Sequence, residues 1–248
     1  MIKFFRRIRQ RLLTENKFTR YLLYAIGEII LVVIGILIAL QVNTWNEGRI
    51  LKEKEKEYLT DIRAFLLEDK KDVDELLEFY DEKQKVYDSL LIRLDAKYTL
   101  NDFLSPFTTY MLTTADAIMF TIKSTAFDNM LSANDIGIIS DKSLRYKLSS
   151  YYSQDPLFGT QDRLKRATRE FRDYVTLSTV TKQNLDAWFK ANTLAPDQND
   201  IEDFRTKPEF YQILFNTTVS ISNEISYLNR QKELIDELIE DIEKELPD

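Results

Sequence analysis

The chain has 248 residues, of which 44% are hydrophobic and 30% are charged, a composition typical of folded rather than disordered proteins. It contains no His and no Cys, which excludes Ser-His-Asp hydrolysis, HExxH zinc hydrolysis, thiolate chemistry and disulfides. Gly and Pro, at five each, are too scarce for a turn-rich β fold and favour long helices. We therefore expect an all-α protein that is not an enzyme and uses no metal or cofactor.

The net charge of −7 conceals a strongly basic N-terminus. Residues 1–20 contain seven Lys or Arg and one acid, whereas the remaining residues contain 27 bases and 40 acids. A basic arm on an acidic body can indicate nucleic-acid binding. Here the arm leads directly into an apolar stretch, so we expect it to lie at a membrane surface and expect no nucleic-acid partner.

Residues 21–42 predict a single transmembrane helix. This stretch has one charged residue, and at ~1.5 Å per residue it would span roughly 33 Å, enough for a hydrocarbon core of about 30 Å. A cleaved signal peptide is the main alternative, but residues 39–43 do not form the A-x-A pattern of a cleavage site. We therefore favour an uncleaved signal anchor.

The basic arm also predicts the orientation of the chain in the membrane. Positive residues flanking a span tend to stay in the cytoplasm, so residues 1–20 are expected there. Residues 46–248 are then expected on the other side, which in a bacterium is the periplasm, with the anchor in the inner membrane.

One face of the expected membrane helix combines a carboxyl group with small residues. At 100° per residue, Tyr24, Glu28, Gly35 and Ala39 align. Small residues four apart let helices approach closely, so this face predicts helix association. Two alternatives remain: Glu28 extends to the cytoplasmic headgroups, or it is an ion-coupling carboxyl.

Amide and aromatic residues follow the apolar stretch. Asn43, Trp45 and Asn46 are expected to form an interfacial motif, because Trp prefers the boundary between lipid and water. The stretch Asn46-Glu47-Gly48 is the expected flexible break before the next helix.

Two long helices are expected in the domain beyond the membrane. Apolar residues recur at steps of three and four over residues 50–94 and again over 209–246, where Pro208 suits the first helical position. We expect the two helices to pair within an antiparallel helical bundle. A parallel coiled coil between protomers is the alternative. The residues of the two stripes are Leu59, Ile62, Leu66, Val73, Leu76, Tyr80, Tyr87, Leu90 and Leu94, and Phe210, Leu214, Ile221, Ile225, Leu228, Ile235, Leu238, Ile242 and Leu246.

Shorter helices and breaks are expected between the two long helices, from local capping and breaking residues. They are a helix over Phe103–Ile122 interrupted near Pro106, a helix capped by Ser124 or Thr125 and reaching Leu131, a turn at residues 134–137, a helix from an Asp141 cap to Tyr152, a break at Asp155-Pro156, a helix from Thr160 or Asp162 to about Leu185, and a loop over 195–208.

Neither the acidic nor the aromatic clusters predict a reaction. Glu68, Asp69, Asp72, Asp74 and Glu75 could suggest carboxylate chemistry, but on such a helix they are expected to form a solvated face. The aromatic residues are expected to fill the bundle core or, alternatively, to line a ligand pocket. The possible pocket residues are Tyr146, Tyr151 and Tyr152.

Three N-terminal segments, residues 17–29, 32–41 and 43–47, together resemble the signature of a family of uncharacterised single-span membrane proteins from the Bacteroidota. Residues 4–9 resemble the same family, and residues 124–127, 139–145 and 151–152 are similar to its soluble part. The resemblance implies a bacterial inner-membrane location and makes Glu28 and the Asn43–Glu47 stretch parts of a recurring motif. It implies no activity.

These observations lead to two hypotheses of function. The first is a membrane-anchored interaction or scaffold subunit that binds another membrane or periplasmic protein or itself. The alternative is a periplasmic small-molecule sensor that signals through a partner, since an arm of about 20 residues carries no output domain.

Overall fold

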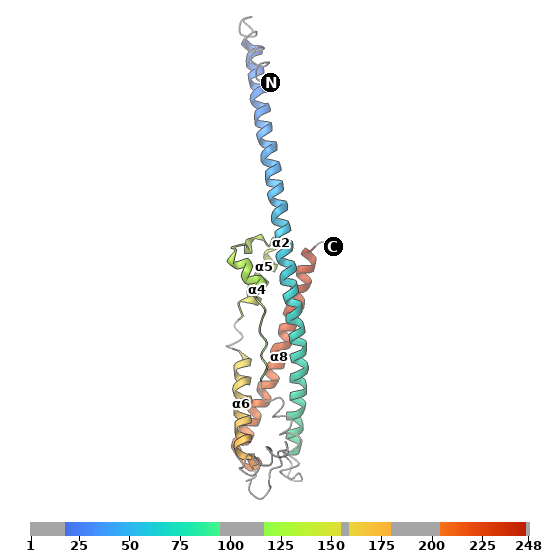
Figure 1. Cartoon of the computed structure of the whole chain (residues 1–248), viewed down its shortest axis with the longest axis vertical. Helices are drawn as coiled ribbons and strands as arrows, with labels where there is room; N and C mark the ends of the chain where they lie inside the picture. The colour runs from blue at the N-terminus through green and yellow to red at the C-terminus, as the bar shows by residue number, and fades with distance from the viewer. Residues whose placement is uncertain (1–17, 95–116, 155–158, 180–203, 247–248) are drawn as a thin grey trace, which may run out of the picture. The chain divides into compact units, whose positions relative to one another are not determined.

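The computed structural model describes residues 18–94, 117–154, 159–179 and 204–246 (Figure 1). Every regular element in these ranges is helical, which confirms the all-α prediction. The elements are α2 (Phe18–Arg93), α4 (Thr125–Ser132), η1 (Ile136–Ile138), α5 (Lys142–Tyr152), α6 (Thr160–Thr179), η3 (Phe204–Thr206) and α8 (Pro208–Glu245).

The chain forms two compact units, Met1–Lys56 and Glu57–Asp248, and the division between them falls within α2. We call them the N-terminal unit and the bundle unit. The finer division into an arm (1–20), a span (21–42) and a domain (46–248) stays a prediction.

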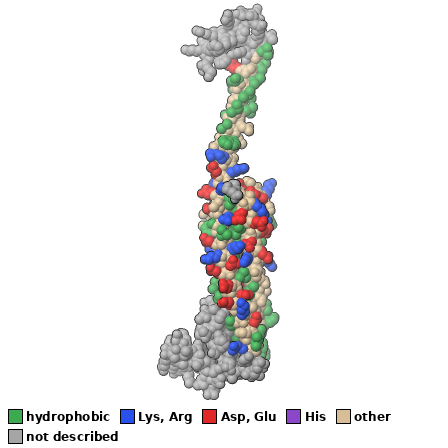
Figure 2. All heavy atoms as spheres, turned by 90° about the vertical axis from the view of Figure 1, so that its right-hand side faces the viewer, with side chains coloured by type: hydrophobic (Ala, Val, Ile, Leu, Met, Phe, Trp, Pro, Cys, Tyr) green, Lys and Arg blue, Asp and Glu red, His purple; other side chains and the backbone are tan. Residues whose placement is uncertain are grey.

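The N-terminal unit presents an apolar helix to its surroundings. From Leu22 to Leu51 no described side chain is buried, and Leu, Ile and Val in this range are about half exposed or more. The visible face of this part of α2 is largely apolar in Figure 2. It is long and apolar enough to cross a membrane, as a membrane anchor or a signal sequence would be.

The expected break at residues 46–48 is wrong, because α2 is helical throughout this stretch. Two bonds between residues four apart support the turn: Asn43 Nδ2 donates to Glu47 Oε1 at 2.7 Å, and Arg49 pairs with Glu53 at 3.1 Å. A single glycine costs a helix only about 1 kcal/mol, so Gly48 does not end it.

In the bundle unit, α2 and α8 bury side chains at alternating steps of three and four residues. This is the spacing of helices that pack as in a coiled coil. The sequence-predicted apolar stripes are confirmed as core, apart from the half-buried Leu94, Ile225 and Leu246. Polar side chains complete the same spacing at five fully buried positions: Asp69, Lys83, Thr217, Glu224 and Gln231.

Ion pairs show that α2 and α8 run antiparallel with a constant register. Arg63 pairs with Glu243, Lys70 with Asp236 at 2.5 Å, and Asp74 with Lys232 at 2.6 Å. Each step forward along α2 is matched by an equal step back along α8. The predicted pairing of the first and last long helices is therefore confirmed, and it lies within one chain.

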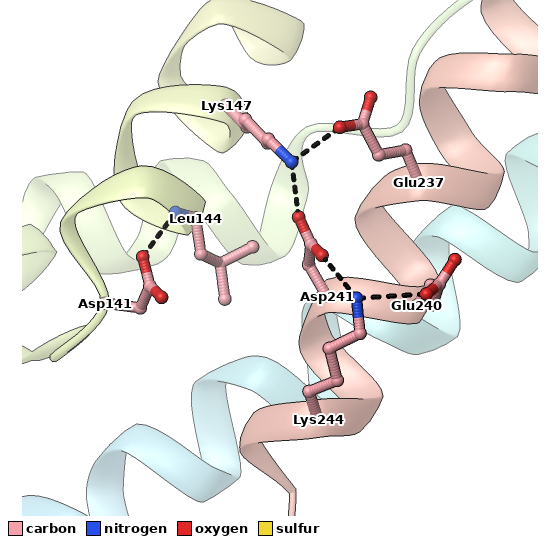
Figure 3. Close-up of polar contacts among 7 residues, drawn as sticks. All are labelled: Asp141, Leu144, Lys147, Glu237, Glu240, Asp241 and Lys244. Atoms are coloured by element: carbon pink, nitrogen blue, oxygen red, sulfur yellow. Dashed lines mark hydrogen bonds and ion pairs between the residues drawn. The ribbon is translucent and has the colours of Figure 1, made fainter.

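Two shorter helices lie end to end along α8. Lys147 of α5 pairs with Glu237 and Asp241, both at 2.6 Å, as Figure 3 shows. Further back along α8, the hydroxyl of Thr217 donates to the carbonyl of Ala167 in α6 at 3.2 Å. As the residue number rises through α5 and α6, the residue numbers of their contacts on α8 fall. The two helices therefore form one column antiparallel to α8, which we call the α5–α6 column.

Residues 117–124 contain no helix, so the prediction of a helix reaching Ile122 is wrong over this part. The hydroxyl of Tyr80 donates to Ile118 O at 2.6 Å, and Lys123 N donates to Asp69 at 3.2 Å. The two anchors on α2, Tyr80 and Asp69, are eleven residues apart, which is about 16.5 Å along a helix. The five steps from Ile118 to Lys123 cover that distance, at ~3.3 Å each, only when the chain is fully extended. Here β-branched and aromatic side chains also favour an extended chain.

Most of the shorter predicted elements are confirmed. Asp141 caps α5 by accepting a hydrogen bond from Leu144 N at 2.9 Å, and Pro208 begins α8. Ser124 precedes α4, but its hydroxyl donates to the Asp128 carboxylate rather than capping the backbone. The predicted features that lie outside the described residues are the interruption near Pro106, the break at Asp155-Pro156, the end of α6 near Leu185 and the loop up to residue 203.

Replacing the α5 cap should destabilise the protein. Asp141→Ala removes the acceptor for Leu144 N, and losing such a cap costs about 1 kcal/mol. Asp141→Asn keeps an acceptor and is the matched control. Urea unfolding of the full chain in nonionic detergent measures both, and equal midpoints for the two variants would contradict the capping role.

Candidate functional site

A fully buried carboxylate, Asp69, joins three elements of the bundle unit. It lies on α2 and accepts a hydrogen bond from the hydroxyl of Tyr151 in α5 at 3.0 Å. It also accepts one from the backbone N–H of Lys123, at 3.2 and 3.3 Å to its two oxygens. Burial raises the pKa of Asp69, and these hydrogen bonds only partly offset that effect.

The side chain of Lys123 supplies a positive charge beside this carboxylate. Its ammonium group lies 3.6 Å from Asp69 and forms a short contact with Asp72. Burial lowers the pKa of Lys123, but its hydrogen bond and charge interaction with Asp72 outweigh this, so the net shift is upward. Lys123 therefore stays protonated and links residues 117–124, which we call the extended segment, to α2.

The extended segment and α2 form the walls of an open groove of about 590 Å³. Most of its lining is apolar and includes Leu76, Phe79 and Phe120. Asp72 and Glu75 add carboxylates from the α2 side. A volume of this size is within the range of ligand pockets.

A second fully buried carboxylate, Glu224, lies on α8 at the start of α6. It accepts hydrogen bonds from Thr160 Oγ1 at 2.9 Å and Gln161 Nε2 at 3.1 Å. The positive end of the α6 dipole favours a carboxylate here. Burial nevertheless raises the pKa of Glu224 more than the two hydrogen bonds lower it.

These polar core residues were missed by the sequence analysis. The expectation that Asp69 lies on a solvated face is wrong, whereas Glu68, Asp74 and Glu75 are exposed. The sequence did contain a sign of their burial. The apolar residues of α2 recur at steps of three and four, and positions 69 and 83 continue that spacing although they are polar. Among the described residues, no group of three or more acids is arranged to hold a metal ion.

The predicted association face lies on the exposed part of α2 in the N-terminal unit. Gly35 and Ala39 are exposed, and a Cβ added at Gly35 would meet no described atom within 4 Å apart from its chain neighbours and the backbone of its own helix. Glu28 is half-buried, and nothing is described for the side chain of Tyr24. Whether this face binds a second helix stays a prediction.

The predicted interfacial residues lie on the same helix. Trp45 is 70% exposed. Asn43 bonds with Glu47, and the Asn46 side-chain oxygen accepts from Arg49 at 3.4 Å. Their place at a lipid boundary stays a prediction.

The three candidate pocket tyrosines lie in different environments. Tyr151 is buried and packs edge-on against Tyr152 at 5.0 Å, and Tyr152 stacks on Phe127 at 4.5 Å. Tyr146 is 76% exposed, although it lines a small pocket of about 110 Å³ together with Tyr151 and α8. A ligand-binding role for these residues stays a prediction.

The model of a family of unknown function, DUF6090, matches residues 28–157, and the chain belongs to this family. The match begins at Glu28 in the apolar part of α2 and covers α4 and α5, including the downstream segments that carried the resemblance. The Bacteroidota source and the single-span nature of the resembling family stay predictions. No curated protein and no solved structure matches the chain.

Removing the donor to Asp69 should destabilise the bundle. Tyr151→Phe leaves the buried carboxylate with one hydrogen bond fewer, and we expect the free energy of unfolding to fall by about 1–3 kcal/mol. Tyr146→Phe, on the same helix but exposed, is the control and should be neutral. Urea unfolding measures both, and a neutral Tyr151→Phe would show that the bond contributes little.

Glu224 should make the bundle less stable as the pH rises. Because its pKa is raised by burial, its contribution is fully present below about pH 4.3, the ordinary value for Glu, and is lost as the pH rises through the folded value. Glu224→Gln should therefore lose less stability than wild type between pH 4.5 and 7. The control is Glu233→Gln, at an exposed site on α8, and an unchanged pH slope in Glu224→Gln would refute the role.

Proposed function

We propose that the chain is a membrane-anchored, non-catalytic helical protein of the bacterial cell envelope that binds another membrane or periplasmic protein or itself. In this proposal the arm is cytoplasmic, α2 crosses the inner membrane over residues 21–42, and the bundle unit lies in the periplasm. Tyr24, Glu28, Gly35 and Ala39 form the face that contacts a partner helix.

The observation that carries this proposal is the uncovered apolar surface of α2 in the N-terminal unit. Leu31 is 73% exposed and Ile29 is 63% exposed, and nothing described in their own unit covers them. At roughly 25 cal/mol per Å² of apolar surface, leaving a whole such helix in water would be very unfavourable. A lipid bilayer supplies the missing cover, and the basic residues 1–20 support retention of the N-terminus in the cytoplasm.

The bundle unit supports a binding role better than a catalytic one. Its buried carboxylates, Asp69 and Glu224, are engaged by hydrogen bonds inside the core. A catalytic carboxylate must instead reach a substrate. The chain has no His or Cys to supply the commonest bases and nucleophiles.

A sensor of small molecules is the second candidate, and the groove of about 590 Å³ is the observation in its favour. The groove is open and mostly apolar, however, and small-molecule sites usually enclose most of their ligand. An open apolar surface fits a protein partner better.

Two arginines in the middle of the span should abolish anchoring. Ile34→Arg with Leu37→Arg costs about 2.5–3.5 kcal/mol per residue at a helix centre, and we expect the protein to leave the membrane fraction on carbonate extraction. Ile34→Ala with Leu37→Ala is the control and should remain anchored. A C-terminal topology reporter tests orientation in parallel, and a cytoplasmic signal or a carbonate-soluble wild type would refute the proposal.

A further inference from the structure

Within the described structure, the middle of the extended segment has backbone groups without hydrogen-bond partners beside the groove. Among the described residues, Tyr80 binds the carbonyl of Ile118 and Asp69 binds the N–H of Lys123. No hydrogen bond is present for the backbone of the four residues between them, Met119 to Ile122, in this part of the structure. An extended chain with unpaired N–H and C=O groups is a template for a second extended chain.

The groove beside this segment has the length and surface that a second strand needs. Residues Ile118 to Lys123 all line it, and the five steps between them span about 16.5 Å at ~3.3 Å per residue. The α2 wall offers Leu76 and Phe79 to alternate side chains of an incoming strand. Phe120 is buried, but Ile118 and Thr121 are exposed, so the segment is accessible from solvent at these two positions.

The charges of the groove favour a basic occupant. Two lining carboxylates, Asp72 and Glu75, outnumber the single lining ammonium of Lys123. That ammonium is already held between Asp69 and Asp72. The other lining carboxylate, Glu75, pairs with Lys71 at 3.5 Å, but both side chains are exposed, so this contact is weak and a Lys or Arg of an incoming strand would replace it.

We propose that this groove binds an extended, basic peptide segment of a partner protein by pairing its backbone with residues 119–122. Main-chain hydrogen bonds supply affinity, and the apolar wall with its two carboxylates selects alternating apolar and basic side chains. The inference rests on the proposed function as a binding protein, for which it names the surface and the kind of partner.

The test measures binding of a defined probe to the full chain in nonionic detergent. The probe is a fluorescein-labelled seven-residue peptide of alternating lysine and valine, followed by fluorescence anisotropy. We expect saturable binding. The same peptide methylated at alternate backbone nitrogens should bind at least about tenfold more weakly, because it has lost donors to the segment. Equal binding of the two peptides overturns the proposal, as does the absence of saturable binding.

A proline tests the segment itself. Thr121→Pro removes an N–H that has no partner in the described structure, and an extended backbone accepts proline, so the fold should be retained. It should weaken probe binding by about tenfold. Thr121→Val keeps the N–H and is the matched control. Equal affinities for the two variants overturn the proposal, and the methylated probe decides independently if Thr121→Pro fails to fold.

Hydrogen exchange gives a third readout. In the free protein, the amides of residues 119–122 should exchange rapidly and should become protected when the probe is saturating. Protection already present in the free protein overturns the proposal, because the edge is then occupied. A dimer disrupted by Thr121→Pro would likewise overturn it, by assigning the groove to a second copy. Carbonate extraction separates these failures from failure of the proposed function, since anchoring does not depend on the groove.

Discussion

The antiparallel seam between α2 and α8 is the contact on which the bundle unit depends. Both helices bury residues at alternating steps of three and four, and their ion pairs keep one register from Arg63–Glu243 to Asp74–Lys232. Such exposed pairs contribute little energy individually. The apolar seam supplies the stability, and the ion pairs mark its alignment. Every other described element of this unit lies along the flank of this pair.

Polar residues in the seam determine where those flanking elements lie. Asp69 binds the extended segment and α5, and Gln231 donates to Gln154, just after α5, at 2.8 Å. Glu224 binds the start of α6, and Thr217 binds its middle. If the seam were entirely apolar, the α5–α6 column could pack at many positions along the axis of α8 with similar free energy. A buried polar group left without its partner costs about 1–3 kcal/mol, so each of these bonds penalises a shifted column. We therefore attribute positional specificity, rather than net stability, to the polar seam.

Helix periodicity made the long elements predictable, because a stripe of apolar residues has few alternatives over forty residues. Capping chemistry predicted the start of α5 at Asp141 and of α8 at Pro208 for the same local reason. Burial of Asp69 and Glu224 was not predictable from residue type, since charged residues are mostly exposed. Only their place in the three-four spacing marks them, and the partners that make burial tolerable lie on elements distant in the chain, at Tyr151 and Thr160.

The extended segment shows how tertiary contacts select between conformations that the local sequence leaves open. Residues 117–124 contain no Gly or Pro, and taken alone they are compatible with a helix. As a helix, the five residue steps from Ile118 to Lys123 would advance only about 7.5 Å, less than half the ~16.5 Å between the levels of Tyr80 and Asp69. The chain thus reaches both anchors only by giving up its internal hydrogen bonds. The lack of hydrogen bonds from the described structure to the backbone of residues 119–122 follows from that geometry, and the groove beside it is where another chain would supply them.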